Sequence, residues 1–402
     1  MIRSLYLCYF GLREPLVQTQ VLPYLRELVR GGVAVSLLTF EAEGRGAWTA
    51  EWREKLKREG IDWHLLRYHK RPTLPATLFD IAAGAWRASR IVRRQRIGLL
   101  HARSHVGAAI GALAKKLSGA RLIFDIRGFL PEEYVDSGNW PKDGVLFRLT
   151  KAAERWLFQS ADAFVVLTER ARETLFPTSG SGQTAGKPVA VIPCCVTAER
   201  IAPRSDRDAV RRDLGVSDRV VYVYIGALGG YYLLRETAEF LAVARENDPR
   251  AYALVLTHGP AAPIVAELER HGLTANDYRV MRAEPADVPV FLGAADVALS
   301  IIRPSYARIA SSPTKFAEYL AAGLPVVSTA GIGDLDGHIE EGRTGALLRS
   351  LDRQAYLDAL RAVETLRRDS TLGDRCRQEA RSRYDLETVG GARYRRLYET
   401  LS

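Results

Sequence analysis

A short segment near residue 315 places hydroxyl groups, a lysine and a carboxylate around the start of an expected helix. A serine and a proline typical of helix N-termini begin this helix, and Gly323 is typical of its end. The first N–H groups of a helix lack partners and attract anions, and Lys315 adds a positive charge. This set suits a diphosphate, and Glu318, one turn later, suits the hydroxyls of a ribose. The alternative is a capped surface helix whose Lys315 and Glu318 are solvated. The hydroxyl donors are Ser311, Ser312 and Thr314.

Charged side chains also follow an expected strand in the first half of the chain. Asp125 and Arg127 lie at the end of the apolar run 121–126, and Glu132 comes shortly after them. In open α/β sheets, ligands bind at the carboxyl ends of the strands. We therefore expect Asp125, Arg127 and Glu132 to contact a ligand bound at this edge. An Asp–Arg pair that braces a loop is the alternative.

Two histidines, His101 and His105, lie in the segment 101–105 at the end of the fourth expected strand and open onto the same edge. Their spacing of four residues is compatible with a metal, but no carboxylate lies near them in the sequence, so we expect no metal site. We expect one of these histidines to touch a substrate bound at this edge.

Apolar runs alternate with helical segments along most of the chain. Short β-rich runs separated by helices of ten or more residues are typical of a parallel sheet with right-handed crossovers. The pattern restarts at 220–225 and ends in a mainly helical tail from about residue 353. Two α/β series of similar size predict two Rossmann-like domains, 1–195 and 196–402, with the helical tail in the second.

The net charge of +10 is unevenly distributed between these halves. Residues 1–195 hold 29 Lys/Arg and 18 Asp/Glu, which gives +11, whereas residues 196–402 hold 28 and 29, which gives −1. The helical segment 74–96 is amphipathic, and arginines crowd its end. Such a segment suits an anionic membrane surface, with a basic surface helix as the alternative.

The four cysteines show neither a disulfide framework nor a zinc spacing, because two are adjacent and two stand alone. A reducing cytoplasm is therefore expected. No apolar run approaches 18 residues, so no transmembrane helix is expected. The apolar N-terminus lacks a small-residue cleavage site and is interpreted as a first buried strand.

Motifs in the second half resemble those of a known enzyme family. The Ser-Pro-Thr-Lys start at 312–319 and the Ala-Gly-Leu-Pro stop at 322–327 resemble the donor-binding helix of family 4 glycosyltransferases, which are retaining enzymes with the GT-B fold. The resemblance implies an α/β protein with two Rossmann-like domains whose parallel sheets face across a cleft. It further implies a C-terminal domain that binds the donor and an N-terminal domain that binds the acceptor. Other matching segments are 296–300, 333–334, 340–342 and 344–345.

Three departures from the family pattern stand out. The family usually has two glutamates eight positions apart; Glu318 matches the second, but Ala310 occupies the first position. The turn after the first strand of the second domain keeps glycines, among them Gly229 and Gly230, which let backbone approach a phosphate, but lacks the usual cations. The segment 124–128 holds no histidine where members often place one at the sugar.

Further site residues follow from the resemblance or from their loops. The resemblance implies that Asp125 and Arg127 position the sugar and the acceptor, and that Glu132, His101 and His105 lie on the acceptor side. In the turn 11–20, which members use near donor phosphate and acceptor, Arg13 and Gln18 are candidates for the acceptor side. His258 and Arg282 end two strands of the second domain, and members read the nucleobase near Arg282. Arg303, in the loop before Ser311, is placed to reach the sugar or the phosphates.

Together these features predict a glycosyltransferase that moves a sugar from a nucleoside-diphosphate sugar, with UDP as the expected nucleotide, to a glycan or lipid-linked acceptor. We expect a metal-independent enzyme without a cofactor, in cell-surface polysaccharide biosynthesis, at the inner face of the cell membrane. A nucleotide-sugar 2-epimerase of the same fold is one alternative. A nucleic-acid-binding protein, suggested by the isoelectric point near 9.5, is another, but no known binding motif appears, and nucleic acid is not an expected partner.

Overall fold

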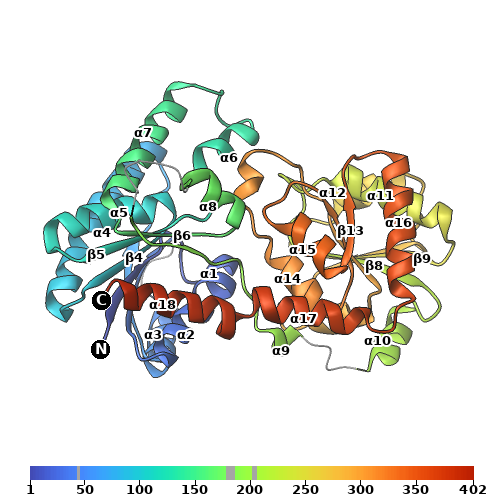
Figure 1. Ribbon diagram of the computed structural model, residues 1–402, viewed down its shortest axis with the longest axis horizontal. Coiled ribbons are helices and arrows are strands. Elements are labelled where there is room, and N and C mark those ends of the chain that lie inside the picture. The colour runs from blue at the N-terminus through green and yellow to red at the C-terminus, as the bar shows by residue number, and fades with distance from the viewer. Residues whose placement is uncertain (43–45, 178–185, 202–205) are drawn as a thin grey trace. The chain divides into compact units, whose positions relative to one another are not determined.

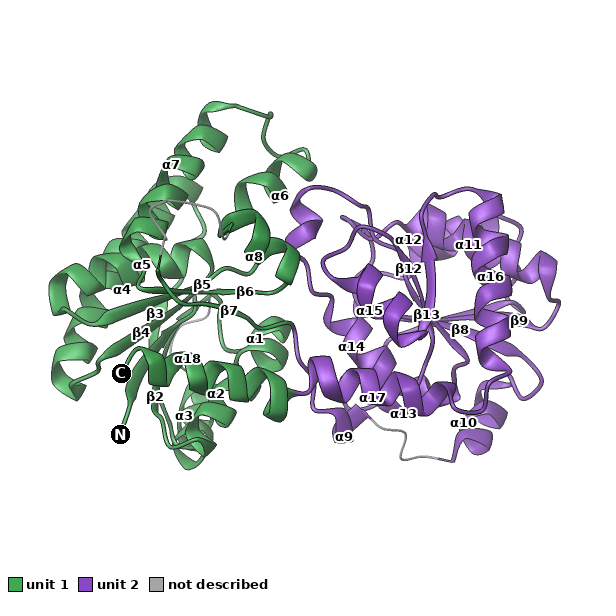
Figure 2. Cartoon of the chain, viewed as in Figure 1, with its two compact units in different colours: residues 1–193, 386–402 green, residues 194–385 purple. Residues whose placement is uncertain are grey.

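The computed structural model describes residues 1–42, 46–177, 186–201 and 206–402. The chain forms two compact units, which Figure 2 shows in different colours. Unit 1 comprises residues 1–193 and 386–402, and unit 2 comprises residues 194–385. The boundary lies two residues before the expected one. The expected assignment of the whole helical tail to the second domain is not what the structure shows, because residues 386–402 belong to unit 1.

Unit 1 is built on a seven-stranded parallel sheet with the strand order β3-β2-β1-β4-β5-β6-β7. The central strands are buried on both faces, which explains their continuous apolar runs. In the register of β1 and β4, Leu7 lies opposite Ala102. The strands are β1 (Arg3–Leu7), β2 (Ala34–Glu41), β3 (Ile61–Arg67), β4 (Leu99–Arg103), β5 (Arg121–Asp125), β6 (Ala163–Val166) and β7 (Val189–Val191).

Helices provide the crossovers that parallel strands require. They are α1 (Pro15–Gln20), α2 (Leu22–Arg30), α3 (Ala47–Arg58), α4 (Thr73–Gln95), α5 (Ser104–Ser118), α6 (Leu130–Asp136), α7 (Val145–Ser160) and α8 (Glu169–Leu175). The end of the chain adds a π-helical turn (Leu386–Gly391) and α18 (Ala392–Thr400).

Helix α18 joins unit 1 because two of its tyrosines are buried there. The Tyr394 hydroxyl donates a hydrogen bond to Asp125 Oδ2 at 3.2 Å, and the Tyr398 hydroxyl lies 2.8 Å from His101 Nδ1. Figure 1 shows this helix in red beside the blue α2. Residues 386–402 therefore complete a core that residues 1–193 begin.

Unit 2 has a six-stranded parallel sheet with the order β10-β9-β8-β11-β12-β13. Apolar clusters cover both faces of this sheet. The strands are β8 (Val220–Ile225), β9 (Ala251–Leu256), β10 (Tyr278–Met281), β11 (Val297–Ser300), β12 (Val326–Thr329) and β13 (Gly345–Leu348). The helices are α9 (Ala198–Ile201), α10 (Arg207–Leu214), α11 (Leu234–Asn247), α12 (Ala262–Arg270), α13 (Val288–Ala294), α14 (Thr314–Ala321), α15 (Leu335–Gly342), α16 (Arg353–Arg367) and α17 (Leu372–Tyr384), with a 3-10 turn at Ala307–Ala310.

Both sheets are doubly wound, as the alternating sequence pattern predicted. In each, the chain starts in the middle, moves to one side and then returns to the other, so the strand order reverses at β1/β4 and at β8/β11. Ligands of such sheets bind outside the carboxyl ends of the strands at this switch point. In unit 2, that position is the end of β8 and β11, next to the start of α14.

Candidate functional site

Helix α14 begins and ends close to the predicted positions. Its first helical residue is Thr314, one later than expected, and Pro313 occupies the cap position. Ser312 is not the cap; its hydroxyl accepts a hydrogen bond from the backbone N–H of Cys194 at 3.1 Å. The helix ends at Ala321, and Gly323 follows with a φ of +84°, a left-handed conformation that glycine adopts without strain.

Tyr319 fixes α14 against the switch point of the sheet. Its hydroxyl accepts a hydrogen bond from the backbone N–H of Ile225, at the end of β8, at 2.9 Å. The same hydroxyl donates to the carbonyl of Leu299 in β11 at 3.2 Å. The sequence pattern indicated only an apolar side of this helix. The structure shows that this side also holds the helix start in register with two strand ends.

Lys315 is buried at this switch point rather than solvated. Its side chain is 6% exposed, and its Nζ has no hydrogen-bond partner among the described residues. A Cβ atom added to Gly226, the residue that follows β8, would lie 3.5 Å from this nitrogen. Burial holds the pKa of the Lys315 ammonium well below its ordinary value. The site therefore contains a cation whose N–H donors point at no acceptor in the described protein.

Glu318 lies one turn further along α14 and is half-buried. Burial raises the pKa of its carboxyl to about 7, and the charges of Lys315 and Arg200 only partly oppose this effect. A carboxyl group that titrates near neutral pH can bind a pair of hydroxyls as an acceptor once it is ionised. Lys315 and Glu318 thus lie together, as predicted from their spacing.

Two loops meet at the carboxyl ends of β8 and β11. The backbone N–H of Arg303 donates to the carbonyl of Tyr231 at 2.8 Å, and Tyr232 forms a bridge with Ile302. Gly229 and Gly230 both have positive φ values, +84° and +67°, so the first of these loops needs its glycines. The turn expected to approach a phosphate is therefore held at the edge where α14 begins.

Arg308 is a second buried cation near the helix start, and the sequence analysis missed it. Its guanidinium lies 4.4 Å from the ring centroid of Tyr231 and 3.3 Å from Ser311 Oγ. The predicted Arg303 has an exposed side chain instead. The 3-10 turn that contains Arg308 carries the residue inward. A basic residue three positions before a predicted anion-binding serine was the signal available in the sequence.

His258 and Arg282 lie further from this edge. His258 follows β9 and is exposed. Arg282 follows the outermost strand β10 and forms an exposed ion pair with Glu284 at 3.1 Å. Their placement at successive strand ends agrees with the sequence prediction, but the structure does not bring them to Lys315.

In unit 1, Asp125 is fully buried and surrounded by protein groups. Besides Tyr394, its carboxylate lies 3.4 Å from Arg127, 3.5 Å from His101 and 3.9 Å from Arg103. Burial alone would raise the pKa of this carboxyl, but the neighbouring Arg127 and His101 hold it well below its usual range. This geometry favours the alternative of an Asp–Arg pair that braces a loop, with α18 as its additional partner.

His105 and Glu132 belong to a second polar chain in unit 1. His105 Nε2 lies 3.1 Å from Glu154 Oε1, and Lys151 bridges Glu154 and Glu132. Ser104, directly before His105, has a φ of +62°, which is rare for a residue with a side chain. His105 thus already has a protein partner. His101, also expected on the acceptor side, lies in the middle of β4, where it is buried against Tyr398, so this expectation is wrong.

The first turn of unit 1 is held by a glutamate that the sequence analysis did not single out. Glu41, the last residue of β2, accepts a hydrogen bond from the backbone N–H of Leu12 at 2.8 Å, and burial raises the pKa of its carboxyl. In the same turn, the Gln18 amide donates to the carbonyl of Leu12, and the exposed Arg13 lies 5.3 Å from the ring centroid of Trp48.

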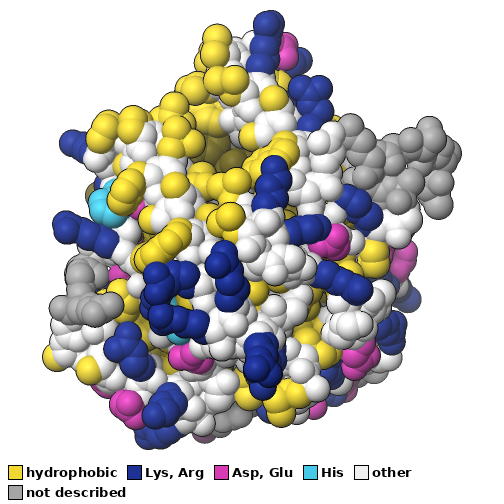
Figure 3. Space-filling view, turned by 90° about the vertical axis from the view of Figure 1, so that its left-hand side faces the viewer, with side chains coloured by type: hydrophobic (Ala, Val, Ile, Leu, Met, Phe, Trp, Pro, Cys, Tyr) yellow, Lys and Arg dark blue, Asp and Glu magenta, His cyan; other side chains and the backbone are white. Residues whose placement is uncertain are grey.

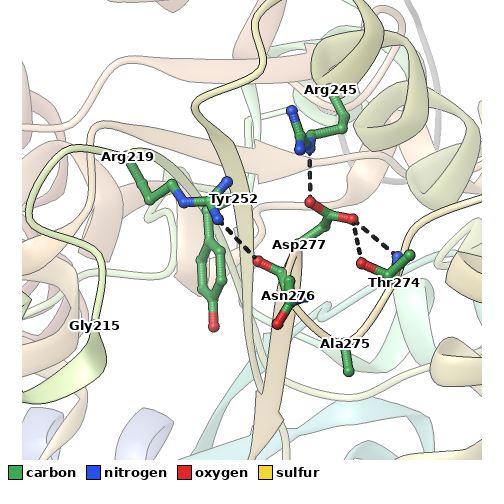
Figure 4. A pocket seen from close by; sticks show the side chains of 8 residues that line it. All are labelled: Gly215, Arg219, Arg245, Tyr252, Thr274, Ala275, Asn276 and Asp277. Carbon is green, nitrogen blue, oxygen red and sulfur yellow. Dashed lines mark hydrogen bonds and ion pairs between the residues drawn. The ribbon is translucent and has the colours of Figure 1, made fainter.

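A polar pocket of about 600 Å³ lies elsewhere in unit 2. It is found at the amino ends of β8, β9 and β10, opposite the edge that carries Lys315 (Figure 4). Its arginines already have partners, since Arg245 binds Asp277 at 2.6 Å and Arg219 donates to the carbonyl of Asn276. This pocket is therefore separate from the candidate site.

No group of three or more His, Cys, Asp or Glu side chains in the described ranges is arranged to hold a metal ion. Likewise, none of the helices described is both long and apolar enough to cross a bilayer.

Comparisons with known proteins agree with this architecture. Residues 17–195 match a glycosyl transferase 4-like domain, and residues 219–365 match the domain of glycosyl transferases group 1. No match is found among curated proteins.

Similar solved structures include a glycosyltransferase from Rickettsia africae, with 14% identity, a TM-score of 0.72, and coverage of 100% of this chain and 98% of that chain. HepE from Anabaena in complex with UDP-glucose has 17% identity, a TM-score of 0.70, and coverage of 100% and 99%. Sucrose-phosphate synthase from Thermosynechococcus elongatus has 15% identity, a TM-score of 0.70, and coverage of 100% of both chains.

Two doubly wound parallel sheets in one chain give the GT-B fold, which the solved structures share, and the two matched domains define the chain as a glycosyltransferase of this class. The two domain matches together cover most of the sequence. The chain belongs to the family 4-like glycosyltransferases, and the expectation drawn from the motifs at 312–327 is confirmed.

Proposed function

We propose that this glycosyltransferase uses a nucleoside-diphosphate sugar as donor and binds its diphosphate at the start of α14. The observation that carries this proposal is Lys315, a buried cation without a hydrogen-bond partner among the described residues. The N–H groups of the first helical turn and the hydroxyls of Ser311 and Thr314 lie beside it in sequence. Arg308 supplies a second positive charge on the other side of Ser311.

The proposed chemistry is stabilisation of the leaving group. When the glycosidic bond of the donor breaks, negative charge develops on the diphosphate oxygens. Donors fixed in a buried site stabilise this charge more in the transition state than in the ground state, which accelerates the reaction. Lys315 and the helix start perform this role, and Glu318 accepts hydrogen bonds from the ribose hydroxyls. Retention of anomeric configuration is proposed from the family resemblance.

UDP is the proposed nucleotide, because HepE, one of the similar structures, was solved with UDP and with UDP-glucose. The proposed acceptor is a glycan or a lipid-linked sugar of cell-surface polysaccharide biosynthesis, bound by unit 1. Arg127, Arg13 and Gln18 at the carboxyl edge of its sheet are the side chains proposed for this contact, since Asp125 is enclosed by protein. Catalysis without a metal remains part of the proposal.

We also propose that unit 1 binds the anionic inner face of the cell membrane through α4. Four apolar side chains of this helix, Leu74, Leu78, Phe79 and Trp86, are 57–60% exposed. The one acidic residue of α4, Asp80, is buried against His69, so no carboxylate opposes a lipid phosphate on this helix. Basic residues follow at the end of the helix, and Arg90 lies 4.8 Å from the ring centroid of Trp86.

Apolar side chains beside arginines are typical of a helix that lies in a membrane interface. Figure 3, which shows this side of unit 1, has hydrophobic side chains among many Lys and Arg and few Asp and Glu. The charge of +11 over residues 1–195 points to the same anionic partner.

Product analysis tests the proposed reaction. The protein is incubated with UDP-sugars, with and without a saccharide acceptor, and the products are separated. Free UDP together with a glycoside supports the proposal, whereas an epimerised UDP-sugar without acceptor consumption contradicts it. A thermal-shift series with UDP, GDP and ADP then tests the nucleotide, and the largest stabilisation is expected with UDP.

A further inference from the structure

The Lys315 ammonium lies between two aromatic rings. Its Nζ is 3.7 Å from the ring centroid of Tyr232 and 4.0 Å from that of Tyr224. A cation within about 6 Å of an aromatic face is attracted to it, and the attraction grows when water is excluded. The described carboxylates offer no ion pair in its place, since no oxygen of Glu318 lies within 4.0 Å of this nitrogen.

The surrounding structure holds both rings in place. The Tyr224 hydroxyl donates a hydrogen bond to the carbonyl of Ala227, and the two rings meet edge to face with centroids 6.1 Å apart. The backbone of Tyr232 bridges Ile302, and its ring packs against Tyr231 at 4.5 Å, which in turn lies under Arg308. Strand β8 and the loop after it thus form an ordered aromatic wall beside Lys315.

We propose that Tyr224 and Tyr232 form an aromatic cage that holds the Lys315 ammonium in its binding position while leaving its N–H donors available to an incoming diphosphate. This inference rests on the proposed function and adds two positioning residues to it. An aromatic face attracts the charge but, unlike a carboxylate, neither neutralises it nor competes with phosphate for its donors. The cage therefore places the cation at the end of β8 although the loop itself supplies none.

A protonation change accompanies this arrangement. Burial lowers the pKa of Lys315, and the groups that face it are Glu318 on α14, Tyr224 on β8 and Tyr232 in the following loop. A bound diphosphate adds negative charge beside the nitrogen and raises that pKa again. At a pH where the free lysine is partly neutral, binding of UDP should therefore take up protons at this site, with a smaller uptake in a Lys315→Arg variant because a guanidinium stays charged.

The decisive experiment compares UDP and uridine binding to the full chain in four variants. Tyr232→Leu removes the π face, Tyr232→Phe keeps it, and Lys315→Met removes the cation alone or together with Tyr232→Leu. We expect Tyr232→Leu to weaken UDP binding about tenfold while uridine binding changes little. Tyr232→Phe should restore most of the UDP affinity, and in the Lys315→Met background Tyr232→Leu should have almost no further effect.

Several results would overturn the cage. If Tyr232→Phe weakens UDP binding as much as Tyr232→Leu does, the hydroxyl rather than the ring is the active group. If Tyr232→Leu costs the same affinity with and without Lys315, or weakens uridine equally, the tyrosine acts on the fold of the loop and not through the cation. If the wild-type protein binds no UDP, the proposed donor site fails and the cage fails with it.

Discussion

Replacing Lys315 by methionine should have opposite effects on catalysis, which we expect to fall, and on the stability of the unliganded protein, which we expect to rise. Methionine keeps much of the length and apolar surface of lysine but removes the ammonium. If Nζ binds the developing charge of the diphosphate, losing this donor costs about 3 kcal/mol in the transition state. We therefore expect kcat/KM for the donor to fall by about 10² to 10³-fold.

The same substitution should stabilise the unliganded protein. A buried polar group without a hydrogen-bond partner costs about 1–3 kcal/mol, and the two aromatic contacts return about 1–2 kcal/mol of this. The net gain from removing the ammonium is then about 1 kcal/mol. In a unit of the size of residues 194–385, this corresponds to a rise in the melting temperature of about 2–4 °C.

Two measurements on the same preparations check this reasoning. Release of UDP from UDP-sugars gives kcat/KM, and thermal unfolding without ligand gives the melting temperature. Lys57→Met is the matched control, because Lys57 is an exposed lysine near the end of α3 and should change neither value. Wild-type turnover in Lys315→Met would refute the donor-site assignment. A drop of several degrees in its melting temperature would refute the argument from the cost of burial.

Five further expectations can be measured directly. Burial raises the pKa of the Glu318 carboxyl to about 7 from an ordinary 4.5. Its contribution to stability is therefore fully present below about pH 4.5 and is lost as the pH rises through 7, so the melting temperature of the wild type should fall relative to Glu318→Gln between pH 5 and 8. Donor affinity should rise over the same interval, and an affinity that falls instead would exclude the carboxylate as the acceptor for ribose. Turnover should survive EDTA, and loss that Mg²⁺ or Mn²⁺ restores would show that a metal is needed. The triple variant of Arg90, Arg93 and Arg94 to Glu should bind anionic vesicles much more weakly, because each basic residue near such a surface contributes about 1 kcal/mol. The variant should still transfer sugar to a water-soluble acceptor. Co-sedimentation with vesicles that is unchanged from the wild type would contradict the membrane proposal. Tyr398→Phe should lower the stability of unit 1 by about 1 kcal/mol, because His101 loses a buried hydrogen-bond partner, and an unchanged unfolding curve would contradict the role given to α18.

The local features of α14 were predictable from the sequence, whereas the environment of its lysine was not. The Ser-Pro start and the glycine stop depend on backbone preferences within a few residues, so the helix bounds were nearly right. The burial of Lys315 depends on Tyr224 and Tyr232, which lie far away in the sequence and meet it only after the sheet has formed. Local patterns carry no information about such a contact.

The small number of residues in some helices and strands is a second limit on predicting them from the sequence. Strand β13 has four residues at the edge of its sheet, and α15 before it has eight, too few for a clear period. Gly345 in β13 fits only because it has no side chain, since a Cβ there would lie 2.0 Å from the carbonyl oxygen of Val326. The difference in net charge between the two halves, in contrast, does not depend on contacts in the folded protein and could be counted directly from the sequence.

The functional residues of unit 1 were harder to interpret. Asp125 and Arg127 do lie at the carboxyl end of a strand, as predicted. The hydroxyl that contacts Asp125 comes from Tyr394, 269 positions later, and this contact turns a candidate ligand-binding carboxylate into an interior group. Nothing in the segment around residue 125 could have indicated that the far end of the chain covers it.

The placement of α18 also sets the order in which the protein can be completed during synthesis. Unit 2 is continuous in the sequence, and all of its residues leave the ribosome before residues 386–402 do. The synthesis of unit 1 begins first, but its helix α18 is synthesised only after the whole of unit 2. During that interval, the groups that α18 will cover, His101 and Asp125 among them, lack their tyrosine partners. Unit 2 is thus able to fold as an ordinary domain during translation, while the native state of unit 1 is reached only after residues 386–402 have emerged.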